Sequence, residues 1–251
     1  MKARKVYEFV NPRARNFKNV ANIGEIKQIK ETALPILEEW DIDPKYCEFT
    51  MMEGNPTVVI NTQINITTDY LGIGDIEIHT WPADYMITES IHIESNSLDS
   101  MPKYLIVRGD LKIESNYNIR ELPKEYLDVQ GDLEISNCGL VDATDLIKYR
   151  IKGSIKLPEN DITVLPDNLK VNGDLHLSGN KKLSKMPSGL KIEGDLYLVN
   201  TSVEIIPDDT EIGGYLYIDR YMPSKSFRIT DPVIRKKLQM PEEIRKYARI
   251  I

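Results

Sequence analysis

The middle of the 251-residue sequence repeats itself about every 21 residues. The tripeptide Gly-Asp-Leu occurs four times, and two degenerate copies fill the gaps in the same period. The successive glycines are 22, 22, 20, 21 and 20 residues apart: Gly109, Gly131, Gly153, Gly173, Gly194 and Gly214. A repeat of this length indicates a stack of similar units, because one such unit cannot bury its apolar side chains alone.

Each repeat contains the pattern of a strand with one buried face. Leu111-Lys112-Ile113 alternates apolar and polar residues after the glycine, which is typical of such a strand. A proline on the same period favours an extended return segment over a helix. Three positions after the second apolar residue comes a small polar residue that could form a buried ladder of hydrogen bonds between coils. These residues are Asn96, Asn116, Cys138, Asn160, Asn180 and Thr201.

The repeats predict a mainly β protein, a parallel β-solenoid of 20–22-residue repeats with short helical caps at both ends. Weaker copies of the strand pattern at Ser90–Ile93 and Ile64–Ile66 extend the stack toward the N-terminus. We expect one parallel sheet with neighbouring strands at about residues 111–113, 133–135, 155–157, 175–177, 196–198 and 216–218.

The repeat resembles the short bacterial leucine-rich repeat. The clearest copy is Leu175-His176-Leu177-Ser178-Gly179-Asn180, which continues through Leu183 to Met186-Pro187. The added segment Leu190-Lys191-Ile192-Glu193-Gly194-Asp195 is similar to a variety found in uncharacterised proteins of tailed bacteriophages, and so is the opening Lys5-Val6-Tyr7-Glu8-Phe9. The resemblance implies an LRR-like solenoid. Because of the added segment, both a horseshoe and a flatter two-sheet solenoid remain open.

The two ends of the chain have the character of caps. We divide the chain into a basic tail (1–20), a helical N-terminal cap (21–56), the repeat solenoid (57–220) and a basic helical C-terminal cap (221–251). Apolar residues recur at helical spacing over 22–42, where Pro35 predicts a kink or a split into two helices. This helix could also bind a partner, but sealing the first coil is the simpler interpretation. Asp231-Pro232 and Pro241 are typical of helix starts near the C-terminus.

Charge is distributed unevenly along the chain. Residues 1–20 and residues 221–251 each carry a net charge of +5, which leaves −17 on residues 21–220 because the whole chain carries −7. An acidic body repels phosphate, so nucleic acid could be bound only through the tails. No apolar run approaches the roughly 20 residues of a membrane helix, so we expect no membrane partner. Two cysteines cannot form a disulfide framework, and this favours a cytoplasmic location.

The sequence contains no recognisable catalytic constellation. The three histidines (His79, His92 and His176) belong to different coils, and none lies at nucleophile spacing from Ser or Cys. Gly72-Ile73-Gly74 lacks the rest of a dinucleotide motif. The repeated aspartates could attract Ca²⁺, although single carboxylates at turns are more simply turn-forming or solvated residues. We therefore expect no enzyme activity, no cofactor and no metal.

The outward strand positions contain the strongest functional signal. Strand alternation turns one polar or aromatic column toward solvent, and its C-terminal end is rich in tyrosine. Exposed aromatic residues are typical of protein-binding hot spots, although the C-terminal helices could instead cover them. The candidate partner-binding residues are His176, Tyr197, Tyr215, Tyr217, Asp174 and Asp195, and Tyr7 and Phe9 form a candidate docking segment in the tail.

The sequence therefore predicts a non-catalytic protein-binding scaffold, phage-encoded and acting on a host or phage protein in the host cytoplasm. One alternative is a virion structural component anchored through its basic tails. Another is an enzyme that completes its site with a partner, and the absence of a catalytic constellation disfavours it. Solenoids host unrelated functions, so the fold does not identify the partner.

Overall fold

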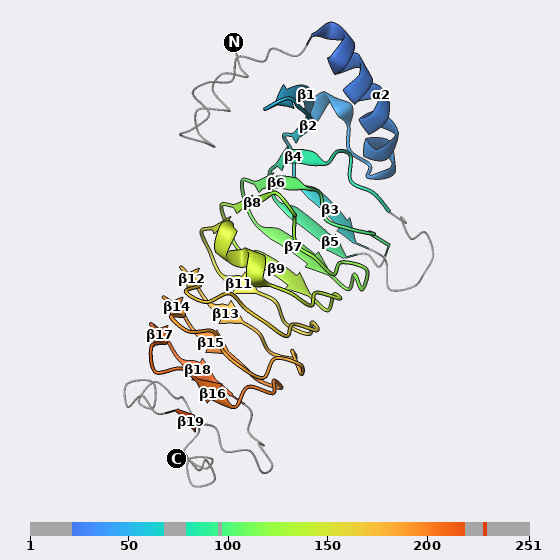
Figure 1. The fold of residues 1–251 in the computed structure, drawn as a ribbon. Helices are drawn as coiled ribbons and strands as arrows, with labels where there is room; N and C mark the ends of the chain where they lie inside the picture. Colours follow the sequence, from blue (N-terminus) through green and yellow to red (C-terminus); the bar gives the residue numbers. More distant parts are fainter. Residues whose placement is uncertain (1–21, 68–78, 95–96, 219–227, 230–251) are drawn as a thin grey trace.

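The computed structural model describes residues 22–67, 79–94, 97–218 and 228–229. They form a mainly β structure, a parallel β-solenoid of about six turns with a helix at its N-terminal end. Figure 1 shows the coils stacked along one axis, with the helix at one end of the stack. The predicted fold class is confirmed for these residues, while the helices expected after residue 230 lie outside them.

Two sheets run along the stack. In chain order, the six-stranded sheet contains β1 (Cys47–Met52), β2 (Asn55–Ile60), β4 (Tyr85–Thr88), β6 (Tyr104–Val107), β8 (Tyr126–Val129) and β10 (Arg150–Ile151). The eight-stranded sheet contains β3 (Ile64–Thr67), β5 (Ile91–Glu94), β7 (Leu111–Glu114), β9 (Leu133–Ser136), β11 (Ile155–Lys156), β13 (Leu175–His176), β15 (Leu196–Tyr197) and β18 (Leu216–Tyr217). The two sheets enclose one continuous apolar core.

The eight-stranded sheet is parallel throughout, as the repeat predicted. The six-stranded sheet is parallel except for the β1 and β2 pair, which is antiparallel. On the same side of the stack lies a three-stranded parallel sheet of β12 (Lys170–Val171), β14 (Lys191–Ile192) and β17 (Glu211–Ile212). Two short strands, β16 (Ile205–Ile206) and β19 (Arg228–Ile229), form a separate parallel pair.

The glycine spacing has a direct steric cause. The N–H of Gly153 donates to the carbonyl oxygen of Gly131 at 2.9 Å, so the backbones of successive coils approach closely at this turn. A Cβ at Gly153 would lie 2.7 Å from that oxygen and 2.2 Å from Oδ1 of Asp132. A side chain would therefore force the coils apart, and glycine recurs with the period of the stack.

The predicted polar ladder forms in part inside the solenoid: Cys138, Asn160 and Asn180 bond across coils, whereas neither Nδ2 nor Oδ1 of the buried Asn116 has a hydrogen-bond partner among the described residues. Nδ2 of the fully buried Asn180 donates to the carbonyl oxygens of Leu157 and Leu177, and its Oδ1 accepts from the N–H of Ile162. Asn160 and Cys138 also contact the backbone of the preceding coil. These bonds satisfy backbone groups that a narrow solenoid would otherwise bury without partners.

The N-terminal cap is one helix, α2 (Ile23–Glu39), followed by the 3-10 turn Pro44–Tyr46 and strand β1. A capping box between Asn22 and Glu25 starts the helix. The helix continues through Pro35, so the predicted split does not occur: packing of Ala33 and Leu37 in the core holds both sides of the proline in one helix. No helix in the described ranges has the length and apolar composition needed to cross a bilayer.

The proline pattern is interrupted in only one repeat, where Ala143 stands near the expected position. The structure places a second 3-10 helix, Thr144–Lys148, immediately after Ala143. Leu146 from this helix is buried in the core. This repeat therefore replaces its extended return segment with a helical turn, while the strands on either side keep their register.

Candidate functional site: the outward face of the eight-stranded sheet

The register of the eight-stranded sheet stacks one outward side chain from every strand. These residues, which we call the outward column, are Asn65, His92, Lys112, Glu134, Lys156, His176, Tyr197 and Tyr217. Their apolar neighbours, such as Leu111 and Ile113, are fully buried in the core. The structure thus brings together His176, Tyr197 and Tyr217 as the strand alternation predicted.

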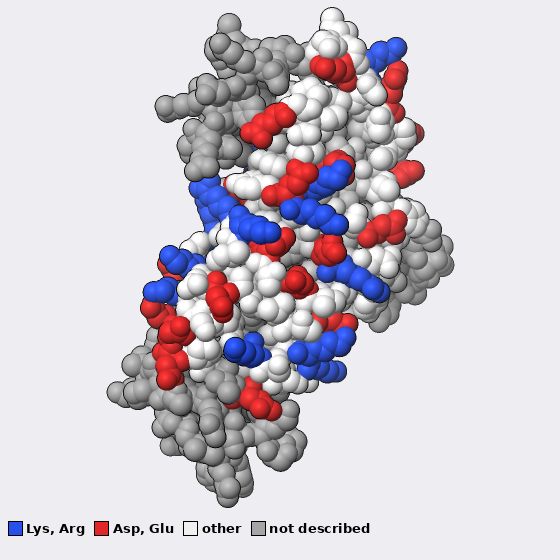
Figure 2. Space-filling view, viewed as in Figure 1, with Lys and Arg blue, Asp and Glu red and all other residues white. Residues whose placement is uncertain are grey.

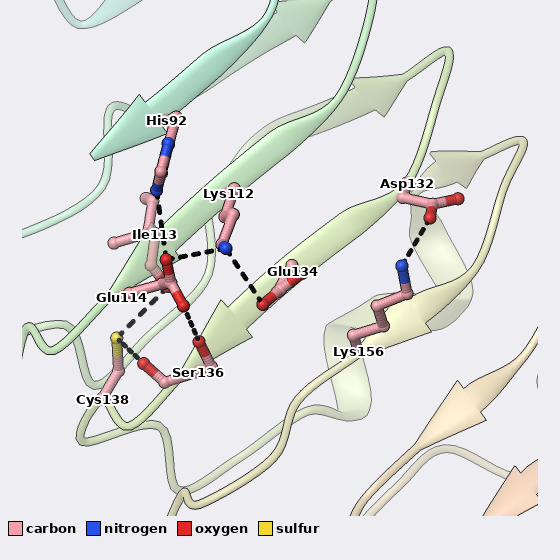
Figure 3. A network of polar contacts seen from close by, with 9 residues as sticks. All are labelled: His92, Lys112, Ile113, Glu114, Asp132, Glu134, Ser136, Cys138 and Lys156. Atoms are coloured by element: carbon pink, nitrogen blue, oxygen red, sulfur yellow. Dashed lines mark hydrogen bonds and ion pairs between the residues drawn. The ribbon is translucent and has the colours of Figure 1, made fainter. Parts of the chain in front are cut away.

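The N-terminal half of the column is a network of paired charges (Figure 3). The carboxylate of Glu114 lies 2.8 Å from Nζ of Lys112 and 3.1 Å from Nε2 of His92. Burial raises the pKa of Glu114, but the hydrogen bonds from Lys112 and His92 outweigh it, so the pKa lies below its ordinary value. Lys112 also lies 3.8 Å from Glu134 on the next strand.

A second pair lies one coil further along. Nζ of Lys156 lies 2.7 Å from Oδ2 of Asp132, and Oδ1 of Asp132 accepts from the N–H of Ser154 at 2.8 Å. Burial alone would raise the pKa of Asp132. The hydrogen bonds from Lys156 and from the Ser154 N–H lower it by more, so the pKa lies below its ordinary value. Figure 2 shows acidic and basic side chains interspersed over the middle of the molecule, so this region offers no large patch of one sign.

The C-terminal half of the column is aromatic. The rings of His176 and Tyr197 lie 5.0 Å apart with an interplanar angle of 43°, and those of Tyr197 and Tyr217 lie 4.4 Å apart at 3°. We call these three residues the aromatic ladder. Because Tyr197 and Tyr217 stack face to face, their facing surfaces are occupied, and the ladder presents ring edges and hydroxyl groups outward.

Burial favours the uncharged forms of His176 and Tyr197 in the aromatic ladder. Burial lowers the pKa of His176 from its ordinary value, which favours the neutral imidazole. Burial, together with the hydrogen bond to Asp195, raises the pKa of Tyr197 to about 12. Its hydroxyl donates to Oδ2 of Asp195 at 3.2 Å. The ladder therefore offers polar groups at the edge of a flat aromatic surface.

Asp174 and Asp195 lie beside the ladder, but they also have a structural role. Oδ1 of Asp174 accepts from the N–H of Asp195 at 2.8 Å, and Oδ1 of Asp195 accepts from the N–H of Tyr215 at 2.7 Å. Asp132 makes the same contact two coils before Asp174, and Oγ of Ser154 accepts from the N–H of Asp174 in the coil between them. The repeated aspartates are thus turn residues that join successive coils. No group of three or more metal-ligating side chains occurs in the part of the chain that the structure describes.

Tyr215 is 45% exposed and lies two positions before Tyr217. It occupies the turn position that Asp174 and Asp195 hold in the two preceding coils. It makes no ring stack with the aromatic ladder among the described residues. The C-terminal helices that could cover this surface lie outside the described residues, as do Tyr7 and Phe9 of the candidate docking segment.

The two thiols are poor nucleophiles. Burial raises the pKa of Cys47 and that of Cys138 to about 11, so both are protonated at neutral pH. Sγ of the buried Cys138 instead contacts the carbonyl oxygens of Ser136 and Ile113. Cys138 therefore acts as a member of the buried ladder.

The sequence reasoning missed a second aromatic stack, on the outer face of the six-stranded sheet. Tyr85, Tyr104 and Tyr126 stack with ring centroids 5.5 and 4.9 Å apart, and we call them the tyrosine ladder. They pack against a second apolar cluster of Met52, Val59, Ile87 and Ile106, the outer apolar cluster. One signal was available, because tyrosine occurs five residues before Gly109 and Gly131, and Tyr85 holds the same position before Ser90 in the preceding repeat.

Searches against protein-family models, curated proteins and solved structures found no match to this chain.

Proposed function

We propose that the protein is a non-catalytic scaffold that binds a protein partner through the aromatic ladder. The observation that supports this most is that the stacked rings of His176, Tyr197 and Tyr217 lie on the outward face of a regular sheet beside a polar column and stay partly exposed. Stacked rings lose little conformational entropy on binding, and a few aromatic residues can dominate the energy of an interface.

The groups around the ladder favour a basic partner. Asp174 and Asp195 each use Oδ1 for the backbone of the next coil, and both carboxylates lie beside the rings. A negative rim of this kind attracts lysine and arginine side chains and accelerates association at low salt. We therefore expect the association rate to fall as the salt concentration rises.

The resemblance of the repeats to short bacterial leucine-rich repeats, and to the variety found in tailed bacteriophage proteins, supports the same proposal. Leucine-rich repeats present one regular face to partners, and a phage-encoded scaffold of this type would act on a host or phage protein. Paired charges along the N-terminal half of the column, such as Lys112 with Glu114, would then flank the binding surface.

The proposal is tested by comparing matched tyrosine variants in capture experiments. The immobilised full-length chain and the double variant Tyr197→Ala, Tyr217→Ala are exposed to lysate, and the retained proteins are quantified by mass spectrometry. Tyr117→Ala is the control, because Tyr117 is 54% exposed and lies outside the ladder. We expect a protein retained by the wild type and the control to lose at least about tenfold in affinity for the double variant.

Melting temperatures of the same proteins separate binding from folding. The double variant should melt close to the wild type, because the ladder residues are only partly buried. Equal retention by all three proteins would contradict the proposal. A double variant that melts much earlier would instead show that the tyrosines support the folded structure.

A further inference from the structure

The outer face of the six-stranded sheet contains apolar side chains that are buried although they point away from the core. Along β6, Leu105 and Val107 point into the solenoid, and Ile106 points to the opposite side. Ile106 is nevertheless only 3% exposed, and Val59 and Ile87, its register neighbours on β2 and β4, are 2% exposed each. Outward residues of a solenoid ordinarily contact water, so this face has the character of a covered surface.

The borders of this face are polar and contain several carboxylates, of which Asp84 is already paired with Lys103 at 2.5 Å. The tyrosine ladder lies along one side of the outer apolar cluster, and carboxylates surround the rings: the hydroxyl of Tyr85 donates to Glu125, and that of Tyr126 lies 3.4 Å from Asp128. Hydrogen bonding to Glu125 raises the pKa of Tyr85 to about 12, with further contributions from Asp84 and Glu53.

Asp128 continues the column of Val59, Ile87 and Ile106 on the next strand, and it is 1% exposed. Its carboxylate accepts from the side chain of Gln130 and lies 3.8 Å from Arg150. Burial is the largest influence on it and raises its pKa above the ordinary value. An apolar strip that ends at a buried carboxylate fits a segment that contains both apolar and basic side chains.

One segment of this chain has that composition. Residues 1–20 contain six Lys or Arg and one acid, Glu8, which lies among the apolar residues Val6, Tyr7, Phe9 and Val10. The described chain begins at Asn22, the N-cap of α2, and this helix packs against β1 and β2 at the same end of the sheet. Thirteen extended residues reach roughly 40 Å, whereas three strand spacings from β2 to β8 cover only about 15 Å.

We propose that residues 1–20 dock on the outer face of the six-stranded sheet in the same chain, with Tyr7, Phe9 and Val10 against the outer apolar cluster. The bases of the segment then lie among the carboxylates of Glu53, Asp84, Glu125 and Asp128. The segment thus acts as an intramolecular cover for a face that the repeats alone leave apolar. This inference is independent of partner binding, because the aromatic ladder belongs to the other sheet.

Site-specific photo-crosslinking in the full-length protein tests this inference. A benzophenone amino acid replaces Phe9, and the same replacement at Phe17 is the matched control from the same tail. After irradiation, the Phe9 probe should attach mainly to peptides that contain β4, β6 or β8, at a yield that does not change over a tenfold range of protein concentration. The Phe17 probe should attach to these peptides at a clearly lower yield.

Three outcomes would overturn the inference: attachment to the eight-stranded sheet, attachment without preference, or a yield that rises with concentration. The last outcome would indicate a second copy of the chain as the occupant. A second measurement uses the variant Tyr7→Ser, Phe9→Ser and an apolar dye. The fluorescence of the dye should be severalfold higher with this variant than with the wild type or with Phe17→Ser. Equal dye fluorescence with all three proteins would also contradict the inference.

Discussion

The two aromatic stacks of this solenoid have similar geometry but different surroundings. Tyr85, Tyr104 and Tyr126 lie on the six-stranded sheet beside four buried apolar side chains. His176, Tyr197 and Tyr217 lie on the eight-stranded sheet beside turn aspartates. Burial is the main reason for the raised pKa of Tyr104, and it acts together with a nearby aspartate hydrogen bond at Tyr197.

This difference shows that ring stacking is a consequence of the repeat and does not by itself indicate a site. A parallel register places the same repeat position of successive coils about 4.8 Å apart, so aromatic residues there stack on either sheet. What separates the two stacks is the neighbouring column. An apolar column makes the first stack part of a packed layer, whereas the second stack has a polar border and rings that are only partly buried.

The largest expected difference concerns the apolar side chains beside the two stacks. Ile106→Ala should lower the free energy of unfolding by about 2–4 kcal/mol, because it leaves a cavity in a packed layer. Val199→Ala is the matched variant beside the aromatic ladder, where Val199 is 37% exposed, and it should change stability by less than about 0.5 kcal/mol. Urea denaturation of both variants measures this, and equal effects would remove the distinction between the faces.

Replacing the tyrosines themselves should also destabilise the first stack more than the second, but the difference in stability should be smaller. Tyr104→Ala removes a ring that contacts two other rings and the outer apolar cluster, so it should cost about 1.5–3 kcal/mol. Tyr197→Ala removes a ring with stacking neighbours but no apolar layer beside it, and should cost less than about 1 kcal/mol. Thermal and urea unfolding would contradict the comparison if Tyr197→Ala proved the more damaging change.

The smallest expected effects concern two aspartates, whose contributions to folding stability should depend on pH in opposite directions. The pKa of Asp132 is lowered in the folded state, so its charge stabilises the fold above the unfolded pKa of about 3.9, and this contribution is lost as the pH falls through the folded pKa. Asp132→Asn should therefore lower the melting temperature at pH 7 by an amount equivalent to less than about 1 kcal/mol. The difference from wild type should disappear in acid.

Asp128 on the six-stranded sheet should behave in the opposite way. Burial raises its pKa, so ionisation of the folded state is unfavourable, and stability falls as the pH rises from the unfolded pKa through the folded one. Asp128→Asn should therefore raise the melting temperature at pH 7 and approach wild type in acid. A decrease at pH 7 would show that the hydrogen bond from Gln130 and the nearby Arg150 guanidinium outweigh the cost of burial.

The sequence by itself determined the stack of coils, the strand positions and the outward column. Alternation in Leu111-Lys112-Ile113 and the spacing of the glycines are local or periodic properties, and a parallel stack repeats them without further information. The same alternation places His176, Tyr197 and Tyr217 on one face, and the register of the sheet agrees with it.

Only the tertiary structure decided what each polar side chain contacts and which outward face is covered. Asp195 bonds to the backbone of Tyr215, twenty residues later, and Ile106 packs in one outer cluster with Val59 and Ile87 of neighbouring coils. Pro35 remains inside one helix because that helix is packed on the first coils. These outcomes depend on contacts between coils, and the pattern within one repeat does not contain them.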